Sequence, residues 1–460
     1  MPLLRLLQLG EKHPYLWDQG QEYDFSHFKQ KVAQILGWLR HRPVGRYAIW
    51  SQDPLLLGAG LFALWHHGSS GLLLPDGQAE TIKQGVTASL GLLSDEPQSP
   101  LEKPFLNLHQ IPSTSESASE IKWQALDPEQ PAVSLFTSGS TGQAKEIQKK
   151  LSHLNEEIKV LESRFGSEMN QTLVTSSVYG FHLYGLLFRL LWPLAVHRPF
   201  SRQTIFMPED LEKSLQEHPR QCFISGPAIL KRFCEFSWLK KQPSPRLVFS
   251  SGGPLACEVS NQWEAIFGQH PIEILGSTET GGIAEKSFKQ NPPSWKIFDS
   301  VLIDRNEEGQ LLVRSPFFGS MEDAPFVMGD RVQLIGPGEF RLLGRIDRIV
   351  KIEEKRVNLV EMEQHLQAHE EVESVVLLES QRVWPSKKRQ SILAVLQLKN
   401  GGLEPGEAKK EMNQRMKQYL SAWYPALVLP RYWRYLGEIP LGPAGKPDYQ
   451  ALCRMLAEEP

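Results

Sequence analysis

One short segment combines the residue types that proteins use to bind phosphate. SLFTSGSTGQAKEIQKK, from Ser134 to Lys150, contains glycines, hydroxyl side chains and a lysine close together. Backbone N–H groups in glycine-rich loops, together with nearby hydroxyls, are common donors to phosphate. The spacing G-x-x-G-x-x-K (Gly139, Gly142, Lys145) differs from the G-x-x-x-x-G-K-[ST] of a Walker loop. By itself the segment fits a phosphate site and a capped tight turn equally well.

Four later segments carry further groups suited to nucleotide chemistry. LGSTETGG puts Thr278 and Glu279 after an expected strand, where a hydroxyl can meet a phosphate and a carboxylate can bind Mg²⁺. MGDRV puts Asp330 after an apolar run, where its carboxylate can accept hydrogen bonds from two ribose hydroxyls. GRIDRIVKIEEKRVNLVEME and PLGPAGKPDYQAL follow, and the second presents Lys446 in a Gly-Lys turn.

Alternating strand and helix patterns predict the scaffold for these groups. A helix with Phe28, Val32, Ile35 and Leu39 on one face precedes the strand VGRYAIW, the helix PLLLGAGLFALWHHG and the strand SGLLLP. This β-α-β rhythm favours a parallel sheet covered by helices. Residues 90–122 are rich in Ser, Pro and Glu and are expected to form a loop.

The same rhythm continues through the phosphate-binding candidates. AVSLF is expected to be a strand that leads into the glycine loop, with LSHLNEEIKVLESRF as the helix after it. RLVFSSGG and IEILGSTE are strands that end in glycine and hydroxyl residues, and ligands of open α/β sheets bind at such carboxyl ends. From about Arg348 the pattern changes to a small α+β unit, including an amphipathic helix with Met412, Met416, Leu420 and Trp423 on one side.

Composition excludes several classes of function. The 460 residues carry a formal net charge of -3, which does not indicate a nucleic-acid partner. The four cysteines form no CxxC pair or Cys/His cluster, so we expect reduced, mostly buried thiols and a cytoplasmic location. The N-terminus does not match a secretory signal, and the longest apolar stretches are too short for a membrane span. We therefore expect a soluble protein.

Together, the five segments resemble the adenylate-forming superfamily of acyl- and aryl-CoA synthetases, adenylation domains and luciferases. The resemblance runs from about Ser134 to the end of the sequence. It implies the α/β class, with a large N-terminal domain of layered sheets at 1–346 and a small mobile α+β domain at 347–460. It also implies an ATP-dependent ligase that forms an acyl-adenylate and pyrophosphate, and then a thioester with CoA or an acyl carrier protein.

The resemblance assigns roles to individual residues. The β,γ-phosphates of ATP are assigned to Thr137, Ser138, Gly139, Ser140, Thr141, Gly142 and Lys145. The rest of the nucleotide is assigned to Ser251, Gly252, Gly253, Gly276, Ser277, Asp330 and Arg345, the last two at the ribose. Thr278 matches the contact to the α-phosphate, Glu279 the ligand of Mg²⁺, and Lys446 the lysine of the first half-reaction. Asp347 matches the hinge, and Lys351 resembles a residue used in the thioester step.

Charge accounts for the chemistry that these roles imply. A carboxylate that attacks the α-phosphate brings two anions together, and Mg²⁺ with Lys446 can offset their repulsion. YGFHLYG resembles the segment that lines the acyl pocket, with His182, Tyr184 and Gly185; aromatic packing in a core is the alternative. Amino-acid-activating relatives usually carry an aspartate there, and none lies between Tyr179 and Gly185. An unpaired buried ammonium is costly, so we expect an aryl or fatty acid.

Some positions depart from the family, and some questions stay open. Leu275 stands where many relatives have an aromatic residue against the adenine, and Glu354 where the family generally has glycine. The Glu354 change leaves open an enzyme that stops at the adenylate. A non-catalytic nucleotide-binding homologue is a further alternative, disfavoured by the presence of Glu279 and Lys446. The acid, the choice between CoA and carrier protein, and a monomeric or homodimeric state are not determined.

The length of the chain suggests one looser resemblance. Fourteen residues follow Lys446, so we expect any carrier protein to be a separate chain. The phosphate loop also lies near the N-terminus for this family. Compact ligases of this kind resemble those of aryl polyene pigment clusters, which load hydroxyaryl acids onto a carrier.

Overall fold

The computed structural model divides into two compact units. The described residues are 3–8, 13–96, 101–111, 118, 121–138, 144–289, 293–345, 348–352, 355–384, 390–401, 406–442 and 447–457. Unit 1 comprises Met1–Ile303, Val313–Phe326 and Pro337–Glu339. Unit 2 comprises Asp304–Leu312, Val327–Gly336 and Phe340–Pro460.

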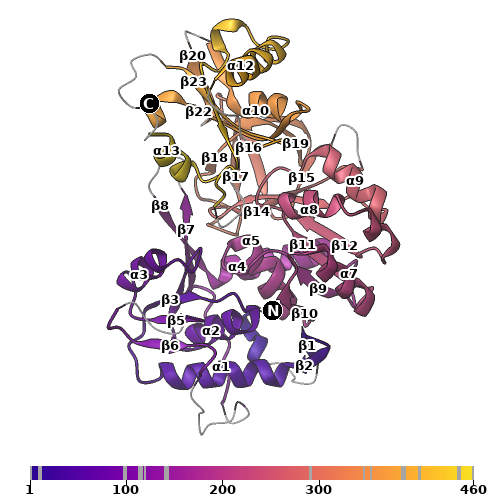
Figure 1. Ribbon diagram of the computed structural model, residues 1–460. Coiled ribbons are helices and arrows are strands. Elements are labelled where there is room, and N and C mark those ends of the chain that lie inside the picture. Colours follow the sequence, from indigo (N-terminus) through magenta and orange to yellow (C-terminus); the bar gives the residue numbers. More distant parts are fainter. Residues whose placement is uncertain are drawn as a thin grey trace. The chain divides into compact units, whose positions relative to one another are not determined.

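A mostly parallel sheet forms the N-terminal part of unit 1 (Figure 1). Its strands lie in the order β6 (Phe105–Asn107), β5 (Leu92–Ser94), β3 (Arg46–Trp50), β4 (Ser70–Leu73), β7 (Pro131–Ser138) and β8 (Ala144–Lys150). Only the β7–β8 pair at one edge is antiparallel among the described pairings. The helices of this part are η1 (Leu3–Gln8), α1 (Phe25–Leu39), α2 (Pro54–His66) and α3 (Ala79–Thr87).

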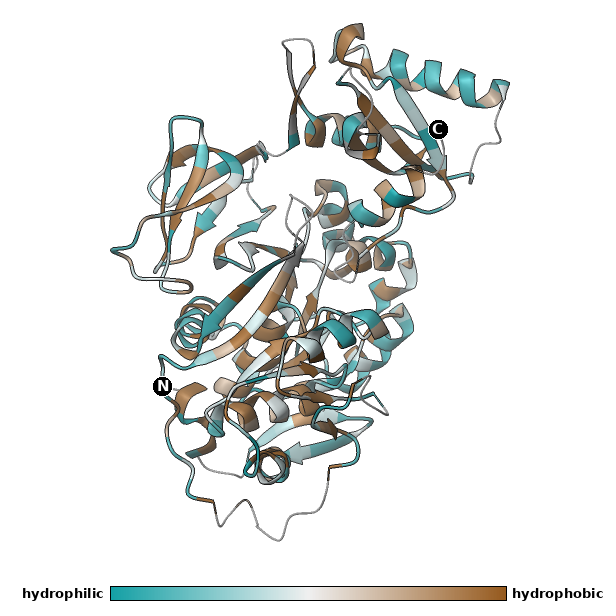
Figure 2. Ribbon diagram, turned by 90° about the vertical axis from the view of Figure 1, so that its left-hand side faces the viewer, coloured by the Kyte–Doolittle hydropathy of each residue, from teal (hydrophilic) through white to brown (hydrophobic). Residues whose placement is uncertain are grey.

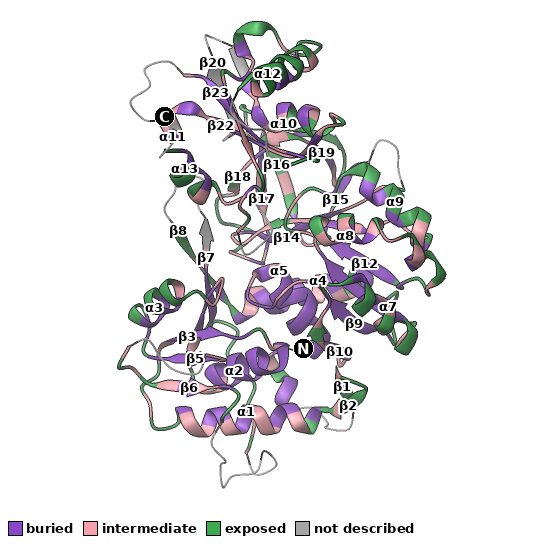
Figure 3. Cartoon of the chain, viewed as in Figure 1, coloured by how far each residue is buried: buried purple, intermediate pink, exposed green. Residues whose placement is uncertain are grey.

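A second sheet of unit 1 holds most of the candidate site. Among β1–β15, the strands of this sheet lie in the order β2 (Gln21–Asp24), β1 (Pro14–Asp18), β10 (Phe200–Thr204), β9 (Leu173–Ser176), β11 (Gln221–Ser225), β12 (Leu247–Ser250), β13 (Ile272–Ser277), β14 (Gly281–Ser287) and β15 (Trp295–Ile297). In this spatial order, each pair of neighbouring strands from β1 to β13 is parallel, and β14 is antiparallel to β13. Residues of β9, β11 and β12 are all buried (Figure 3), as expected of parallel strands covered on both faces.

Helices connect and cover the strands of this second sheet. They are α4 (Leu151–Phe165), α5 (Leu183–Gly185), the π-helical η2 (Leu186–Leu191), α6 (Trp192–Ala195), α7 (Pro208–Glu217), α8 (Pro227–Cys234), η3 (Ser237–Lys241) and α9 (Cys257–Phe267). Inside η2, Arg189 is fully buried and donates to the carbonyls of Val178 (2.8 Å) and Arg202 (3.0 Å). Burial lowers the pKa of Arg189 to about 10. Its guanidinium thus ties the chain after β9 to β10.

Local sequence explains where the first helices begin. Asp24 caps α1 by accepting a hydrogen bond from the backbone N–H of Ser26 (3.0 Å), and Asp53 caps α2 in the same way. Helix α2 also has a proline in its first turn, where no N–H is needed. The predicted apolar face of α1 is buried, which confirms its orientation.

Unit 2 contains a hairpin-rich part and a three-stranded sheet. Its strands and helices are β16 (Leu302–Arg305), β17 (Gln310–Arg314), β18 (Phe326–Gly336), β19 (Glu339–Arg345), β20 (Ile349–Ile352), β21 (Lys355–Asn358), α10 (Leu359–Gln367), β22 (Val372–Glu379), α11 (Ser380–Val383), β23 (Ile392–Leu398), α12 (Glu407–Leu420), η5 (Ala426–Val428), β24 (Tyr432–Leu436) and α13 (Tyr449–Ala457). The first four include a few residues of unit 1. The sheet has the order β22-β23-β24, with β22–β23 antiparallel and β23–β24 parallel.

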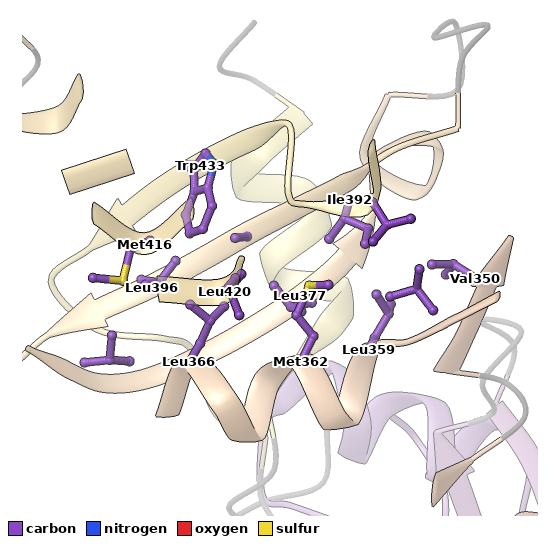
Figure 4. Packing of buried hydrophobic residues seen from close by; sticks show 14 of the residues in the cluster. Val350, Leu359, Met362, Leu366, Leu377, Ile392, Leu396, Met416, Leu420 and Trp433 are labelled. Atoms are coloured by element: carbon purple, nitrogen blue, oxygen red, sulfur yellow. The ribbon is translucent and has the colours of Figure 1, made fainter. Parts of the chain in front are cut away.

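Both faces of the three-stranded sheet are packed. Residues of α10 and α12 pack with Leu377 and Leu396 on one face (Figure 4). Residues of α11 and α13 pack with Val376 and Val395 on the other. The period of two along each strand sends neighbouring side chains to opposite faces. Figure 2 shows that hydrophobic residues (brown) are concentrated in the strands of this sheet and hydrophilic residues (teal) on the outer helices.

The predicted α/β class is confirmed, and three local expectations were wrong. Residues 90–122 include the short strands β5 and β6 rather than loop alone. Helix α12 ends at Leu420, so Trp423 lies outside its apolar face, is exposed and stacks on His365. Only Cys222 of the four free thiols is buried. The domain boundary at residue 346 stays a prediction, and within the described residues no helix has the length and apolar character of a membrane span.

Candidate active site

The predicted phosphate loop connects β7 to β8 in unit 1. Thr137 pairs with Lys145 and Ser138 with Ala144, so the connection is residues 139–143. Gly139, Ser140, Thr141 and Gly142 belong to that connection and lie outside the described residues, as do the side chains of Thr137 and Ser138. Lys145 is exposed on β8.

A strand, not a helix, follows the loop. We expected the helix to come next, but the seven residues of β8 intervene and α4 begins at Leu151. A strand of that length extends about 20 Å. The N-terminal N–H groups of α4 therefore lie a full strand length away from the start of β8 at Ala144.

The Thr278–Glu279 pair occupies the turn between β13 and β14. Ser277 and Thr280 close this turn with three mutual hydrogen bonds of 3.2 Å, and Thr280 is fully buried. Thr278 and Glu279 between them are half-buried. Gly281 follows with φ +72°, a conformation that favours glycine. The turn therefore presents a hydroxyl and a carboxylate side by side on a fixed backbone.

Two buried charged residues hold this turn from the side of β8 and α4. The Lys149 ammonium donates to the carbonyls of Glu279 (2.8 Å) and Phe317 (2.9 Å). The Glu157 carboxylate accepts from the backbone N–H of Gly282 (2.6 Å). Both side chains are almost completely buried. Hence the turn at Glu279 and the start of β14 at Gly282 are hydrogen-bonded, through their main chain, to charges outside the hairpin.

Burial opposes the charged form of each partner. It lowers the pKa of the Lys149 ammonium, while the negative charges of Glu157 and Glu279 act in the opposite direction. Burial also raises the pKa of the Glu157 carboxyl, and the positive charge of Lys149 together with the Gly282 N–H act against that rise. Each charge thus makes the burial of the other less unfavourable.

Our interpretation of the sequence missed both residues, although the pattern contained a signal for Glu157. Glu157 interrupts the apolar stripe of α4 formed by Leu154, Ile158 and Leu161. Lys149 lies opposite Val133 on a strand of the sheet. A charged residue at a position that periodicity assigns to the core has to find a partner there.

The predicted nucleotide residues of unit 1 gather at neighbouring strand ends. Ser251, Gly252 and Gly253 follow β12, and Gly276 and Ser277 end β13, which pairs in parallel with β12. The Ser251 hydroxyl donates to the carbonyl of Ile274 (2.9 Å), which joins the two ends directly. A Cβ at Gly276 would lie 2.3 Å from the carbonyl oxygen of Gly281, so the hairpin closes only over glycine.

The predicted acyl segment lies after β9, on the same sheet. His182 and Tyr184 are half-buried, and the hydroxyl end of Tyr184 is inside the protein, which raises its pKa. The Tyr184 ring packs against Phe188 at 4.8 Å between centroids. A Cβ at Gly185 would lie 1.9 Å from the Tyr179 carbonyl oxygen, so this turn requires glycine.

The predicted ribose residues come together in unit 2. Asp330 on β18 is buried, and Arg345 on β19 lies 3.5 Å from its carboxylate. Gly329 makes room for this approach, because a Cβ there would lie 2.8 Å from the Arg345 guanidinium. The structure therefore brings together two residues that are fifteen positions apart in the sequence.

The remaining predicted residues of unit 2 gain no structural support. Asp347, Glu354 and Lys446 lie outside the described residues. Lys351 pairs with Arg356 in the β20–β21 hairpin, but its side chain is not described. Their assigned roles stay predictions.

Comparisons with known proteins agree with this fold. A profile of the AMP-binding enzyme family matches residues 62–317. The chain is 25% identical over 355 residues to D-alanine–D-alanyl carrier protein ligase of Bacillus cereus strain B4264, covering 69% of each. It is 34% identical over 124 residues to tyrocidine synthase 3 of Brevibacillus parabrevis, covering 27% of this chain but only 2% of that protein.

Two solved structures share the fold across the whole chain. ATP-bound MatB from Rhodopseudomonas palustris superposes with a TM-score of 0.82 at 16% identity, covering 99% of this chain and 98% of that one. O-succinylbenzoate coenzyme A synthetase from Bacillus subtilis, in complex with AMP, gives a TM-score of 0.78 at 19% identity, covering 98% and 97%. Because the family profile matches more than half of the sequence, the chain belongs to the AMP-binding enzyme family, as the five motifs predicted.

Proposed function

We propose that this enzyme is an AMP-forming acid–thiol ligase. It joins a carboxylic acid to ATP to give an acyl-adenylate and pyrophosphate, then transfers the acyl group to the thiol of CoA or of a free-standing carrier protein. The observation that carries the proposal is the Thr278–Glu279 turn, fixed at the carboxyl ends of β12 and β13 next to Ser251–Gly253. Ligands of open α/β sheets bind at such ends.

In the first step a carboxylate oxygen attacks the α-phosphorus, and the bond from that phosphorus to the bridging oxygen of pyrophosphate breaks. The leaving group takes the electron pair, so no proton has to be moved. The task of the protein is to align two anions and offset their charge. We assign that task to the Thr278 hydroxyl at the α-phosphate, the 137–142 loop and Lys145 at the pyrophosphate, and Lys446.

The turn suits a magnesium ion bound together with ATP. Mg²⁺ in nucleotide sites is held by one or two carboxylates plus phosphate oxygens, rather than by a cage of protein ligands. Glu279 supplies one half-buried carboxylate, and the described residues contain no cluster of three metal-binding side chains. When bound, the ion would neutralise charge on the phosphates. Glu279 is the residue that would hold it.

In the second step the thiol loses its proton to solvent, its sulfur bonds to the acyl carbon, and the bond from that carbon to the phosphate oxygen breaks, so that AMP leaves with the former carboxylate oxygen and the electron pair. Asp330 and Arg345 are proposed to hold the ribose during both steps, and their mutual contact supports a shared role. Rotation about Asp347, removal of Lys446 from the site and use of Lys351 are the proposed changes between the steps.

The acid is proposed to be an aryl or fatty acid. The predicted acyl segment contributes aromatic rings of its own: Tyr179 stacks on Phe181 with 4.9 Å between ring centroids, and the Tyr179 and Phe206 centroids are 5.5 Å apart. Residues 179–185 offer no carboxylate to an α-ammonium group. Within this class, a hydroxyaryl acid loaded onto a separate carrier is the narrower proposal.

Pyrophosphate release across a panel of aryl, fatty and amino acids tests the acid class. We expect release with at least one aryl or fatty acid and none with D-alanine or other amino acids. Release with amino acids alone would contradict the assigned class. Absence of release with every acid would contradict the ligase itself.

Replacement of Lys446 tests the order of the two steps. We expect Lys446→Ala to abolish pyrophosphate release but to transfer preformed acyl-AMP to the thiol at close to the unmodified rate, because the lysine offsets charge only in the first step. Single-turnover assays with synthetic acyl-AMP measure the second step alone. Equal loss of both steps would contradict the role of Lys446.

A second candidate function is an enzyme that stops at the adenylate. The observation that favours it is Glu354, at a position where relatives generally have glycine. Trapping separates the two proposals. If acyl-AMP accumulates while neither CoA nor carrier protein is acylated, the enzyme is an acyl-AMP ligase.

A further inference from the structure

We propose that Lys149 is a positioning residue that sets the orientation of the metal ligand Glu279 through its main chain. The inference rests on the proposed function, because it assumes that Glu279 binds the metal ion. Lys149 itself touches neither the metal nor the substrate in this proposal. It acts on the carbonyl of Glu279 and couples that carbonyl to the segment around Phe317.

The contacts of Lys149 join three distant segments. Its ammonium bonds to carbonyls that lie 130 and 168 positions further along the chain. Two of the three N–H donors of the ammonium bond to these carbonyls, and the negative charges of Glu157 and Glu279 stabilise its charged form electrostatically. Hydrogen bonds that involve a charged donor are shorter and stronger than neutral ones. The carbonyl of Glu279 is therefore held more firmly than a neutral partner would hold it.

Glu157 completes the arrangement at the start of β14. Its carboxylate accepts from Gly282, three residues after Glu279, while Lys149 holds Glu279 itself. A Cβ at Gly281 would lie 2.4 Å from the Glu157 carboxylate, so this carboxylate lies directly against the backbone of the turn. The two charges thereby fix the chain on both sides of Thr280.

Stability alone does not account for two charges at this place. Apolar residues of similar volume often replace a buried ion pair without loss of stability, because taking charges out of water is costly. The contacts seen here go instead to backbone groups of the turn that carries Glu279. Magnesium demands near-ideal octahedral geometry, so a small rotation of its carboxylate ligand weakens binding. A role in positioning Glu279 explains why Lys149 and Glu157 are charged and why they bond to backbone groups of the turn and the start of β14.

Manganese binding tests this inference without any turnover. Mn²⁺ is titrated, with detection by electron paramagnetic resonance, into the enzyme saturated with a non-hydrolysable α,β-methylene analogue of ATP. We expect Lys149→Met to weaken Mn²⁺ binding about tenfold, the lower end of the effect of losing an outer partner of a metal ligand. Affinity for the analogue without metal should stay within about twofold, since Lys149 does not contact the nucleotide.

Lys286→Met is the matched control. Like Lys149, Lys286 is a largely buried cation, but it belongs to the β13–β14 hairpin itself. Its ammonium pairs with the Glu273 side chain (2.8 Å), at the end of the hairpin away from the turn. We expect it to lower the thermal midpoint and to leave Mn²⁺ affinity unchanged. Equal weakening of Mn²⁺ binding in both variants would mean that general destabilisation is the cause, and the inference would be overturned.

A double variant separates positioning from stability. Lys149→Met leaves the Glu157 charge buried without its cation, which is destabilising. Adding Glu157→Gln removes that charge but keeps an oxygen for the Gly282 N–H. We expect Lys149→Met/Glu157→Gln to recover much of the thermal midpoint and to keep the weak Mn²⁺ binding. Recovery of both properties together would overturn the inference.

The outcome is distinguishable from failure of the proposed function. If the unmodified enzyme binds Mn²⁺ with the analogue, the Lys149 comparison is informative whether or not any acid releases pyrophosphate. If Glu279→Gln leaves Mn²⁺ binding unchanged, the metal role of Glu279 is wrong, and the inference about Lys149 is overturned with it. If Glu279→Gln weakens binding and Lys149→Met does not, only the inference about Lys149 fails.

Discussion

The β13–β14 hairpin carries buried charges at both of its ends, and the two ends use them differently. At the open end, Glu273 and Lys286 pair side chain to side chain, and the ammonium lies over the rings of Phe288 and Trp295 at 4.8 and 4.7 Å. At the turn end, Lys149 and Glu157 come from outside the hairpin and bond to its main chain.

The side-chain pair at the open end holds two strands together, whereas the main-chain contacts at the turn end fix the conformation of the turn. A side-chain pair across two strands adds to the ladder but leaves backbone dihedral angles to the ladder itself. Contacts to the Glu279 carbonyl in the turn and to the Gly282 N–H just after it restrict those dihedral angles directly. At the open end, Glu273 also accepts from the backbone N–H of Leu255 (3.0 Å), which lies outside the hairpin. The end that carries the predicted metal ligand is the one where charged side chains bond to the main chain of the hairpin itself.

The largest expected contrast comes from the same chemical change made at both ends. We expect Glu279→Gln to reduce kcat/KM for pyrophosphate release roughly 100-fold or more, as for the loss of one electrostatic stabiliser of a transition state. Glu273→Gln, six residues earlier, should change the rate less than about threefold while lowering the free energy of unfolding by about 1–3 kcal/mol. Steady-state kinetics and urea unfolding measure the two. Similar rates for both variants would remove the distinction between the two ends.

A smaller contrast is expected between two glycines with the same backbone conformation. Gly281 has φ +72° and a Cβ position 2.4 Å from Glu157, whereas Gly268 has φ +74° and open space. We expect Gly268→Ala to cost about 1–2 kcal/mol of unfolding free energy, from conformation alone. Gly281→Ala should cost about 1–3 kcal/mol more, because a neighbour has to move.

The activity of these alanine variants gives the second half of this test. Only Gly281→Ala should slow pyrophosphate release, since only that substitution displaces Glu157 from the turn. If Gly268→Ala slows the reaction as much, strain in the turn is not the cause.

The smallest expected effect is on the pKa of His153, a residue of α4 that lies close to Lys149 of β8. Burial lowers the pKa of His153 to about 4, with the charges of Lys149 and Lys150 acting in the same direction. A histidine with a lowered folded pKa contributes stability above its ordinary value of 6.5 and loses it as the pH falls through about 4. We expect Lys149→Met to raise this pKa toward 6.5 and Lys286→Met to leave it unchanged.

Nuclear magnetic resonance titration of ¹³C-labelled histidine measures this pKa in each variant. An equal shift in the two variants would mean that His153 does not sense the local charge of Lys149. The acid unfolding curve should move with the pKa, since the same protonation drives both.

Most elements of the scaffold follow from periodicity in the sequence. The limits of α4 match the predicted helix, and the stripe on α1 is buried as its spacing requires. Strand β8 was missed because AKEIQKK is mostly polar, and five of its residues would not be assigned to a sheet by hydropathy. It forms as the edge partner of β7, a pairing that a single segment does not encode.

The residues of the candidate site also fall into those that the sequence predicted and those that it did not. The resemblance assigned Asp330 and Arg345 to the same ribose, and their side chains lie together. Lys149 and Glu157 carry no motif, and their role depends on a turn more than a hundred residues away. Sequence spacing identifies groups that meet a ligand, but not those that hold such groups from a distant element.

The π-helical turn at Leu186–Leu191 gives the helix that follows the acyl segment a property of its own. A wide turn of this kind contains one more residue than an α-helical turn, and each residue of an α-helix advances the chain by about 100°. Gaining or losing one residue here therefore rotates every later side chain of the helix by about a quarter of a turn around the helix axis. Relatives of different length at this point would present different side chains to the same sheet while keeping the same helix axis.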